Sequence, residues 1–227
     1  MYPPTVENEM RLQLGKSVHL ADGATQQLVD VVVDSGSKRV THVVVQPRDH
    51  GEEARLVPVG LAEEPEAGGG ELSLRCSAQD LKNFDLVHEF EVLHAGERPK
   101  EDPKWDVGVE DIVVTPSYVP TAYGAYEGGL DSEVAISYDR VPKGEIELRR
   151  ASSVYSADGH RLGSVEGVDV SEGDRLAHLF FQRGHLWWKR EVRVPAESIS
   201  KFESDTVTLG LRKDELPSAQ KAGVSGP

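Results

Sequence analysis

The chain has 227 residues, and its 25 Lys and Arg against 39 Asp and Glu give a formal net charge of −14. This negative field disfavours non-specific binding to nucleic-acid backbones. The single cysteine, Cys76, excludes an intrachain disulfide and a zinc site built from several cysteines. No run of 18 apolar residues is present, and the chain opens without the pattern of a signal peptide, so no transmembrane segment is expected. We therefore expect a soluble, cytoplasmic protein with one large or two small domains.

The N-terminal segment, residues 1–10, carries two prolines and two glutamates, and we expect it to be disordered. Met10 is an alternative start of the chain, because the regular pattern of the sequence begins directly after it.

An internal repeat is the most informative feature of the sequence. Residues 17–46 align without a gap to residues 153–182, at an offset of 136 positions, and 11 of the 30 pairs are identical. A period this long indicates two copies of a domain rather than a solenoid. We define the first copy as residues 11–83 and the second copy as residues 138–216. The identical pairs include Asp22/Asp158, Gly23/Gly159, Val29/Val165, Val32/Val168 and His42/His178.

Each copy is predicted to consist of short β-strands. Asp-Gly dipeptides at residues 22–23 and 158–159 predict tight turns. Segments rich in β-branched residues follow, at residues 28–33 and 40–46 of the first copy. Five or six strands in about 65 residues would leave exposed strand edges as a flat sheet, and closure into a small barrel removes these edges. Short helical turns are expected at the end of each copy, where acidic residues precede a leucine.

These stretches resemble the PRC-barrel domain, a small β-barrel. The resemblance is carried by residues 18–23 through 41–45, and by residues 154–159 through 177–181. Residues 138–145 and 183–192 look like the corresponding parts of bacterial proteins with two PRC-barrel copies. The family includes the cytoplasmic domain of the photosynthetic reaction-centre H subunit and the C-terminal domain of a ribosome maturation factor, which share a barrel and no chemistry. The resemblance therefore implies an all-β fold of two tandem barrels that serves docking or regulation, without catalytic residues.

Residues 84–137 match neither copy and are predicted to form an irregular acidic linker. An alternative is an interaction segment that docks through its tyrosines, because tyrosine offers a large contact area at low entropic cost. The three tyrosines of this segment are Tyr118, Tyr123 and Tyr126.

The tail, residues 217–227, is expected to be disordered.

Several polar residues of the repeat are candidates for catalysis or metal binding. His42 and His178 could be metal ligands or pH sensors, but a hydrogen-bonded strand histidine explains both. The two aspartates of the Asp-Gly turns are explained by their turns, and Cys76 replaces a leucine of the other copy, which marks it as a core residue. We therefore predict no catalytic residue, no metal site, no cofactor and no enzymatic activity.

The best candidate site is a hairpin of the second copy that combines two tryptophans with cations. Adjacent strand residues face opposite sides, so Trp187 and Trp188 cannot both enter one core if the hairpin is regular. One tryptophan would then bind a partner, or it would pack on the other copy or on the linker. In the second case, the acidic residues 97–111 could cover the hairpin from within the same chain. The predicted partner-binding residues are Arg183, His185, Trp187, Trp188, Lys189, Arg190 and Arg193.

The function that we expect is that of a non-catalytic protein-interaction or scaffold module with a protein partner. The alternative is an RNA- or ribosome-associated accessory factor, which would stack bases on the Trp/Arg hairpin. Residues 146–227 hold 12 basic and 12 acidic side chains, so this last segment does not repel an acidic group. Homo-oligomer formation stays open.

Overall fold

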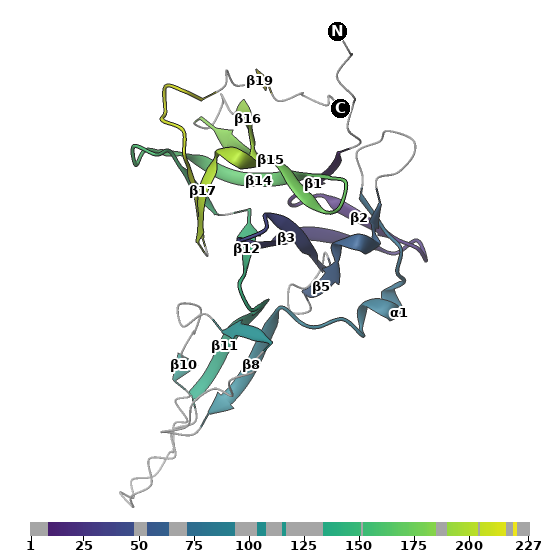
Figure 1. Cartoon of the computed structure of the whole chain (residues 1–227). Helices are drawn as coiled ribbons and strands as arrows, with labels where there is room; N and C mark the ends of the chain where they lie inside the picture. The colour runs from purple at the N-terminus through teal and green to yellow at the C-terminus, as the bar shows by residue number, and fades with distance from the viewer. Residues whose placement is uncertain are drawn as a thin grey trace, which may run out of the picture.

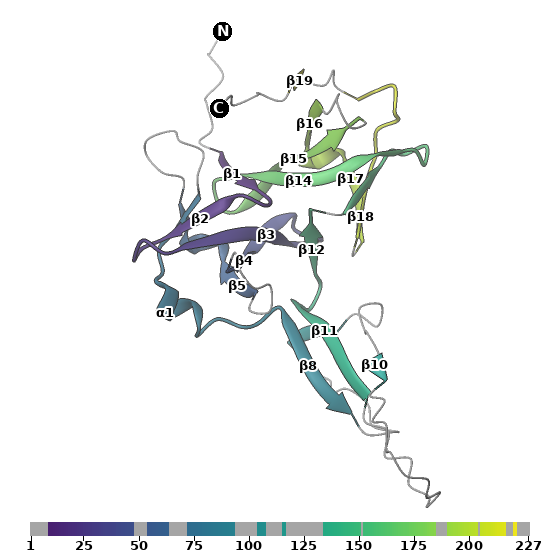
Figure 2. The same cartoon turned by 180° about the vertical axis from the view of Figure 1, so that it is seen from behind.

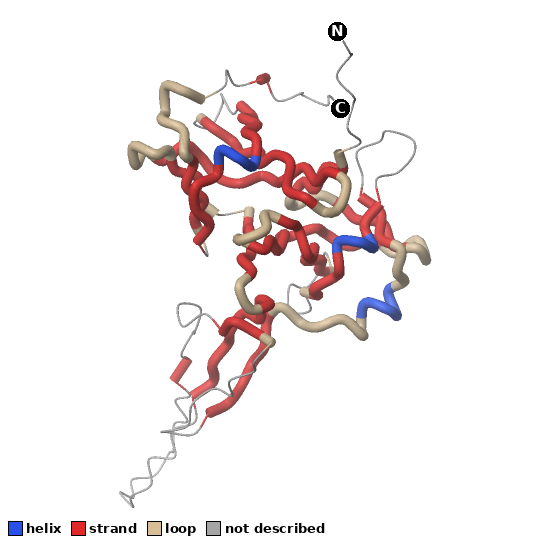
Figure 3. Tube along the Cα trace, viewed as in Figure 1, coloured by secondary structure: helices blue, strands red, loops and turns tan. Residues whose placement is uncertain are grey.

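The computed structural model describes most of both copies and parts of the segment between them. The fold is all-β, and the described residues contain one short α-helix and two 3-10 turns among the strands (Figure 3). Within the described part, no helix is long and apolar enough to cross a membrane. The described residues are 9–47, 54–63, 72–93, 104–107, 115–116, 134–150, 152–184, 190–203, 205–216 and 220–221.

The first copy forms six neighbouring strands in the order β6-β7-β2-β3-β4-β5. Strands β2 and β7 are parallel, and the other pairs are antiparallel. The helix α1 (Ala78–Leu81) follows, capped by Ser77 and Asp80 in a reciprocal capping box. The strands are β2 (Ser17–Leu20), β3 (Thr25–Asp34), β4 (Arg39–Gln46), β5 (Arg55–Pro58), β6 (Ala62–Glu63) and β7 (Leu72–Leu74), with the 3-10 turn η2 (Val59–Leu61) after β5.

The second copy repeats this order as β17-β18-β13-β14-β15-β16. Its parallel pair is β13 with β18, and Val154 lies opposite Val207 just as Val18 lies opposite Leu72. Its strands are β13 (Ser153–Tyr155), β14 (Arg161–Ser171), β15 (Arg175–Arg183), β16 (Arg190–Pro195), β17 (Ile199–Glu203) and β18 (Thr206–Leu209), with the 3-10 turn η4 (Ala196–Ser198) after β16.

The pairing register corrects part of the ungapped alignment. The long hairpin of each copy is irregular at two matching places, but the second hairpin has a turn one residue shorter and a first strand one residue longer. As a result, positions of β3 correspond to positions of β14 that lie 137 residues later. Val32 faces His42 across its hairpin, whereas Asp169, not Val168, faces His178. The identity of Val32 and Val168 therefore does not reflect the same place in the fold.

The leading strands are exchanged between the copies. Strand β1 (Met10–Gln13) lies at the start of the first copy but pairs with β14 of the second. Strand β12 (Glu145–Arg149) lies near the start of the second copy but pairs with β3 of the first. Leu12 lies opposite Val168, and Leu148 lies opposite Val31, which are equivalent positions. Figures 1 and 2 show β1 beside β14 and β12 beside β3. Each copy is thus completed by a strand that belongs in sequence to the other.

The turns of the two long hairpins also meet reciprocally. The amide of Val40 donates to the carbonyl of Asp174 (2.8 Å), and the amide of Leu176 donates to the carbonyl of Lys38 (2.9 Å). Together with the exchanged strands, these contacts join the described strands of both copies into one 15-stranded sheet. The described pairings leave this sheet open, so the two closed barrels predicted from the sequence are not seen. The sequence pattern identifies strands but does not specify the edge with which each strand pairs.

One main core runs through both copies. It contains the inward side chains of both parallel strand pairs and of the exchanged strands, and Leu12, Leu148, Val207 and Leu209 are all fully buried in it. Strand β18 therefore directs Val207 and Leu209 into the core. Leu74, the counterpart of Leu209, is 2% exposed.

The segment between the copies is not wholly irregular, contrary to the prediction. Its described strands form a separate antiparallel sheet that projects from the main body (Figures 1 and 2). Strand propensity combined with pairing between distant segments outweighs the breakers that separate them, and Tyr118, Tyr123 and Tyr126 lie outside the described residues. The strands are β8 (His88–Leu93), β9 (Trp105–Val107), β10 (Thr115–Pro116) and β11 (Val134–Pro142).

Both predicted disordered ends contain paired residues. Met10 opens β1, and Gln220–Lys221 forms strand β19, which pairs with Arg190 and Glu191 of β16. An exposed strand edge accepts such short segments readily because its backbone groups need partners. The remaining residues of the two predicted segments lie outside the described part of the chain.

Candidate functional site

The Trp/Arg hairpin predicted as the partner-binding site is described only at its base. Arg183 ends β15 and lies opposite Arg190, which begins β16. Residues 185–189 lie outside the described residues, so His185, Trp187, Trp188 and Lys189 are not placed.

The described arginines of this hairpin face two different ways. Val192 and Val194 enter the main core, so Arg193 between them lies on the outer face of the sheet. Arg190 lies on the same side of β16 as the core residue Val192, and Arg183 lies on the same side of β15 as Phe181. Both arginines are beyond the end of the core. The predicted single cationic surface is therefore divided: Arg183 and Arg190 lie at the strand ends, and Arg193 lies elsewhere.

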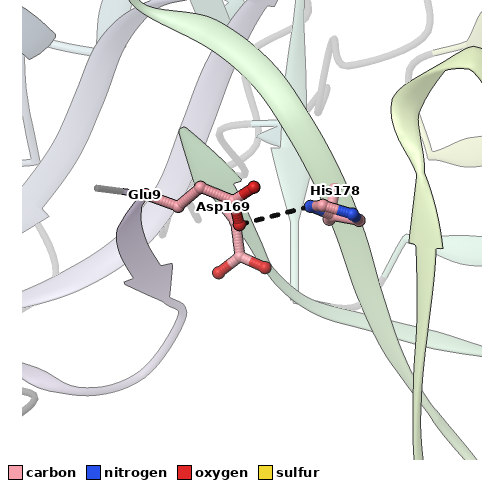
Figure 4. Close-up of side chains that lie close together, drawn as sticks. All are labelled: Glu9, Asp169 and His178. Atoms are coloured by element: carbon pink, nitrogen blue, oxygen red, sulfur yellow. Dashed lines mark ion pairs between the residues drawn. The ribbon is translucent and has the colours of Figure 1, made fainter. Parts of the chain in front are cut away.

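Arg193 is the centre of an internal ion-pair cluster, and its three partners, Glu9, Asp169 and His178, are drawn in Figure 4. Its Nε lies 2.7 Å from Oδ2 of Asp169, and its Nη2 contacts the carboxylate of Glu9. The same Nη2 lies 3.1 Å from Nδ1 of His178, which is 3.3 Å from Oε2 of Glu9. Arg193 therefore fulfils a structural role in joining β16 to β14, to β15 and to the residue directly before β1.

The same cluster has the residue types of a metal site. Ligand atoms of Glu9, Asp169 and His178 lie within 4.8 Å of one another, and two carboxylates with an imidazole suit several divalent metals. The guanidinium of Arg193 contacts all three residues and already supplies the positive charge there. A metal ion would have to displace it, so the geometry supports an ion-pair cluster better than a metal centre.

Asp169 needs this cation because it is buried. Burial raises the pKa of its carboxyl group, and the nearby charges of Arg193 and Arg11 oppose that effect. Arg11 comes from the exchanged strand β1, where it also pairs with Glu191 (2.6 Å) and lies 4.1 Å from the ring centroid of Phe180.

The first copy contains a matching but simpler contact. Nδ1 of His42 lies 3.7 Å from Oε2 of Glu145, which also accepts a hydrogen bond from the hydroxyl of Thr41. Burial lowers the pKa of His42, and the Glu145 charge opposes that shift. In each copy, a strand histidine thus contacts a glutamate at or beside the exchanged strand: His42 contacts Glu145 of β12, and His178 contacts Glu9, which directly precedes β1.

Sequence reasoning missed these two Glu–His contacts, although the repeat contains a signal for them. Glu9 and Glu145 stand at the offset of 136, as do Leu12 and Leu148. Extending the alignment backwards from residue 17 would have found both leading strands. It would not have shown that they are exchanged.

The aspartates and the cysteine have the structural roles predicted for them. Asp22 accepts hydrogen bonds from the amides of Ala78 (2.8 Å) and Ala24 (3.1 Å), and these bonds lower the pKa of its carboxyl group. Asp158 accepts from the amide of Lys213 (3.3 Å), and a hydrogen bond from Ser156 is the main cause of its lowered pKa. Cys76 is buried, and burial raises the pKa of its thiol.

A cleft at the base of the hairpin contains cations that sequence reasoning did not connect. We name it the cationic cleft; Arg183, Arg212 and Lys213 line it together with Asp158 and Asp214. Among the described residues, none of these three cations forms an ion pair.

The first copy has no such charges at the equivalent positions. Corresponding hydrogen bonds fix the equivalence: Ser77 N donates to Asp80 (2.9 Å) as Arg212 N donates to Glu215 (2.8 Å). On this basis, the counterparts of Arg183, Arg212 and Lys213 are Pro47, Ser77 and Ala78. The cleft is therefore a feature of the second copy only.

A scan against protein-family models finds no match to this chain, and a search of curated proteins finds no significant match either.

Proposed function

We propose that this chain is a non-catalytic, cytoplasmic protein-interaction or scaffold module built from two PRC-barrel-like copies, residues 11–83 and 138–216. The shared strand order, the matching parallel pairs and the matching hairpin irregularities support a common domain type. The resemblance to the PRC-barrel family implies docking rather than chemistry, and such a fold-level analogy needs support from a site.

The observation that carries the proposal is the difference between the copies at the cationic cleft. The first copy builds the same turn and strand end with Pro47, Ser77 and Ala78, so the fold does not require cations there. Arg183, Arg212 and Lys213 gather at one place in a chain of net charge −14. Charge that the fold does not need is a mark of a recognition surface.

The sequence next to the cleft has the composition of an interface. Trp187 and Trp188 lie in the same hairpin, between Arg183 and Arg190. Tryptophan and arginine are the residues most enriched among those that dominate binding energy at protein interfaces.

The test is capture of a partner by the tagged full-length chain, followed by reconstitution with the purified partner. Trp188→Ala with Arg190→Ala should abolish binding and leave the melting temperature nearly unchanged. Lys201→Ala, which removes an exposed cation that pairs with Glu203 on β17, serves as the control and should bind as the parent does.

Two outcomes would overturn the proposal. One is a reconstituted partner that binds the double variant and the parent equally well. The other is a partner that is released by nuclease treatment, which would favour the RNA- or ribosome-associated alternative.

A further inference from the structure

We infer that the cationic cleft is a docking site for an acidic segment of a partner protein. This inference rests on the proposed function and adds the chemistry of the partner. It uses only Arg183, Arg212, Lys213 and their two acidic neighbours, all of which the structure describes.

The backbone of the cleft is held in place by hydrogen bonds. The amide of Lys213 donates to Asp158, the amide of Arg212 donates to Glu215, and the amide of Ala157 donates to the carbonyl of Leu211 (2.9 Å). Arg183 is fixed by its place at the end of β15. The three cationic side chains therefore start from defined positions, and Arg212 and Lys213 are exposed residues.

The cleft keeps an excess of positive charge. Asp158 and Asp214 oppose three cations, and the Asp158 carboxylate already accepts a hydrogen bond from the Lys213 amide and lies 3.5 Å from His160. The arginines of the outer face differ, since Arg11 pairs with Glu191 and Arg193 pairs with Glu9 and Asp169. In the part of the chain that the structure describes, no carboxylate forms an ion pair with the three cations of the cleft.

The shape and the charge together favour a peptide. The cleft is open rather than enclosed, and its cations come from two separate segments, at the end of β15 and after β18. Several carboxylates spread along an extended chain match this arrangement better than one small anion does. A nucleic acid that extends well beyond the cleft would meet the negative field of the whole chain, whereas a short acidic segment need only reach the cleft.

The experiment measures fluorescence anisotropy of a labelled oligoglutamate peptide with the full-length chain at low and high salt. The variant is Arg183→Gln/Arg212→Ser/Lys213→Ala, in which the last two changes introduce the residues of the first copy. The control is Arg161→Gln/Arg175→Gln/Lys201→Ala, which removes the same charge from exposed positions of the second copy. Oligoglutamine and an RNA oligonucleotide of equal length are the comparison probes.

We expect oligoglutamate to bind the parent and the control at low salt, with weakening at high salt. The cleft variant should bind roughly tenfold more weakly, which is the sum of three exposed charge contacts. Because Arg212 and Lys213 are exposed, the melting temperature should not change. Should the triple variant fail to fold, Arg212→Ser alone must still weaken binding relative to Arg161→Gln.

Equal binding by the cleft variant and the control would overturn the inference. So would no binding of oligoglutamate by the parent at low salt, or tighter binding of RNA than of oligoglutamate at the same cations. A partner that depends on Trp188 and Arg190 while oligoglutamate does not bind would leave the proposed function standing. In that case only the acidic chemistry assigned to the partner would be wrong.

Discussion

The outer sheet faces of the two copies show how one fold accepts two different surfaces. In the first copy, Val32, Val44 and Leu56 are buried in a small apolar cluster with Val87, at the start of the projecting segment. At the equivalent positions, the second copy has Asp169, Phe180 and Arg193. The inner faces, by contrast, are apolar in both copies.

The differences on the outer face occur as spatially adjacent pairs. Where the first copy has Val32 and Leu56, the second has the ion pair of Asp169 with Arg193. Where the first copy has Asp30 opposite Val44, the second has Gly167 opposite Phe180. A buried acid is tolerated because a cation accompanies it, and a phenyl ring is tolerated because the facing residue has no side chain.

The largest expected effect concerns the shared inner face. Leu209→Ala and Leu74→Ala should each lower the free energy of unfolding by about 2–5 kcal/mol, because both remove a fully packed side chain. Thr208→Ala, on the opposite side of β18, should stay within about 0.5 kcal/mol. Denaturant midpoints measure these losses. Equal midpoints for Leu209→Ala and Thr208→Ala would mean that Leu209 of the second copy does not face the core as Leu74 of the first copy does.

Much of this inner face could be predicted from sequence, whereas the outer face could not. Alternation and β-branching identify Val207 and Leu209 as inward from β18 alone, because a strand's periodicity is local. The cluster of Arg193 with Glu9 and Asp169 depends on which edge β1 joins, and no local pattern specifies that. Arg193 therefore looked like a free cation beside the tryptophans, although the fold pairs it internally.

The second prediction tests the Gly167–Phe180 pair. A Cβ atom at position 167 would lie 2.2 Å from the carbonyl oxygen of Leu12 and 2.4 Å from Cζ of Phe180. Gly167→Ala should therefore cost about 3 kcal/mol, the upper part of the range for overpacking. Adding Phe180→Val, which introduces the residue of the first copy, should relieve the contact with the ring. The double variant should lose less stability than the two single losses added together. Strict additivity in denaturant unfolding would show that glycine and ring are not coupled.

The third prediction tests the ion pair. Arg193→Leu leaves the Asp169 carboxylate buried without its nearest cation, so the free energy of unfolding should fall by about 1–3 kcal/mol. Because about half of the Arg193 side chain is exposed, this loss is smaller than for a fully buried ion pair. Asp169→Val with Arg193→Leu restores the residues of the first copy and should recover most of that loss. If the double variant is less stable than Arg193→Leu alone, the two copies do not use interchangeable solutions at this place.

The smallest effect concerns the histidine contacts that join the copies. Burial lowers the pKa of His42 below its ordinary value of 6.5, while the charges of Glu145 and Asp85 act in the opposite direction. The unfolded chain therefore takes up a proton near pH 6.5, whereas the folded chain takes it up only at lower pH. Between these two pKa values the unfolded state binds more protons, so stability falls as the pH falls through that window, by at most about 1.4 kcal/mol per pH unit.

His42→Gln should remove this contribution, so its unfolding free energy should decline less below pH 6.5 than that of the parent. Glu145→Gln should act in the opposite sense, because it removes the charge that favours protonated His42 and keeps an acceptor for Thr41. A parent slope that His42→Gln does not alter would show that acid sensitivity arises elsewhere. The exchanged glutamate of β12 would then position its histidine without linking the fold to pH.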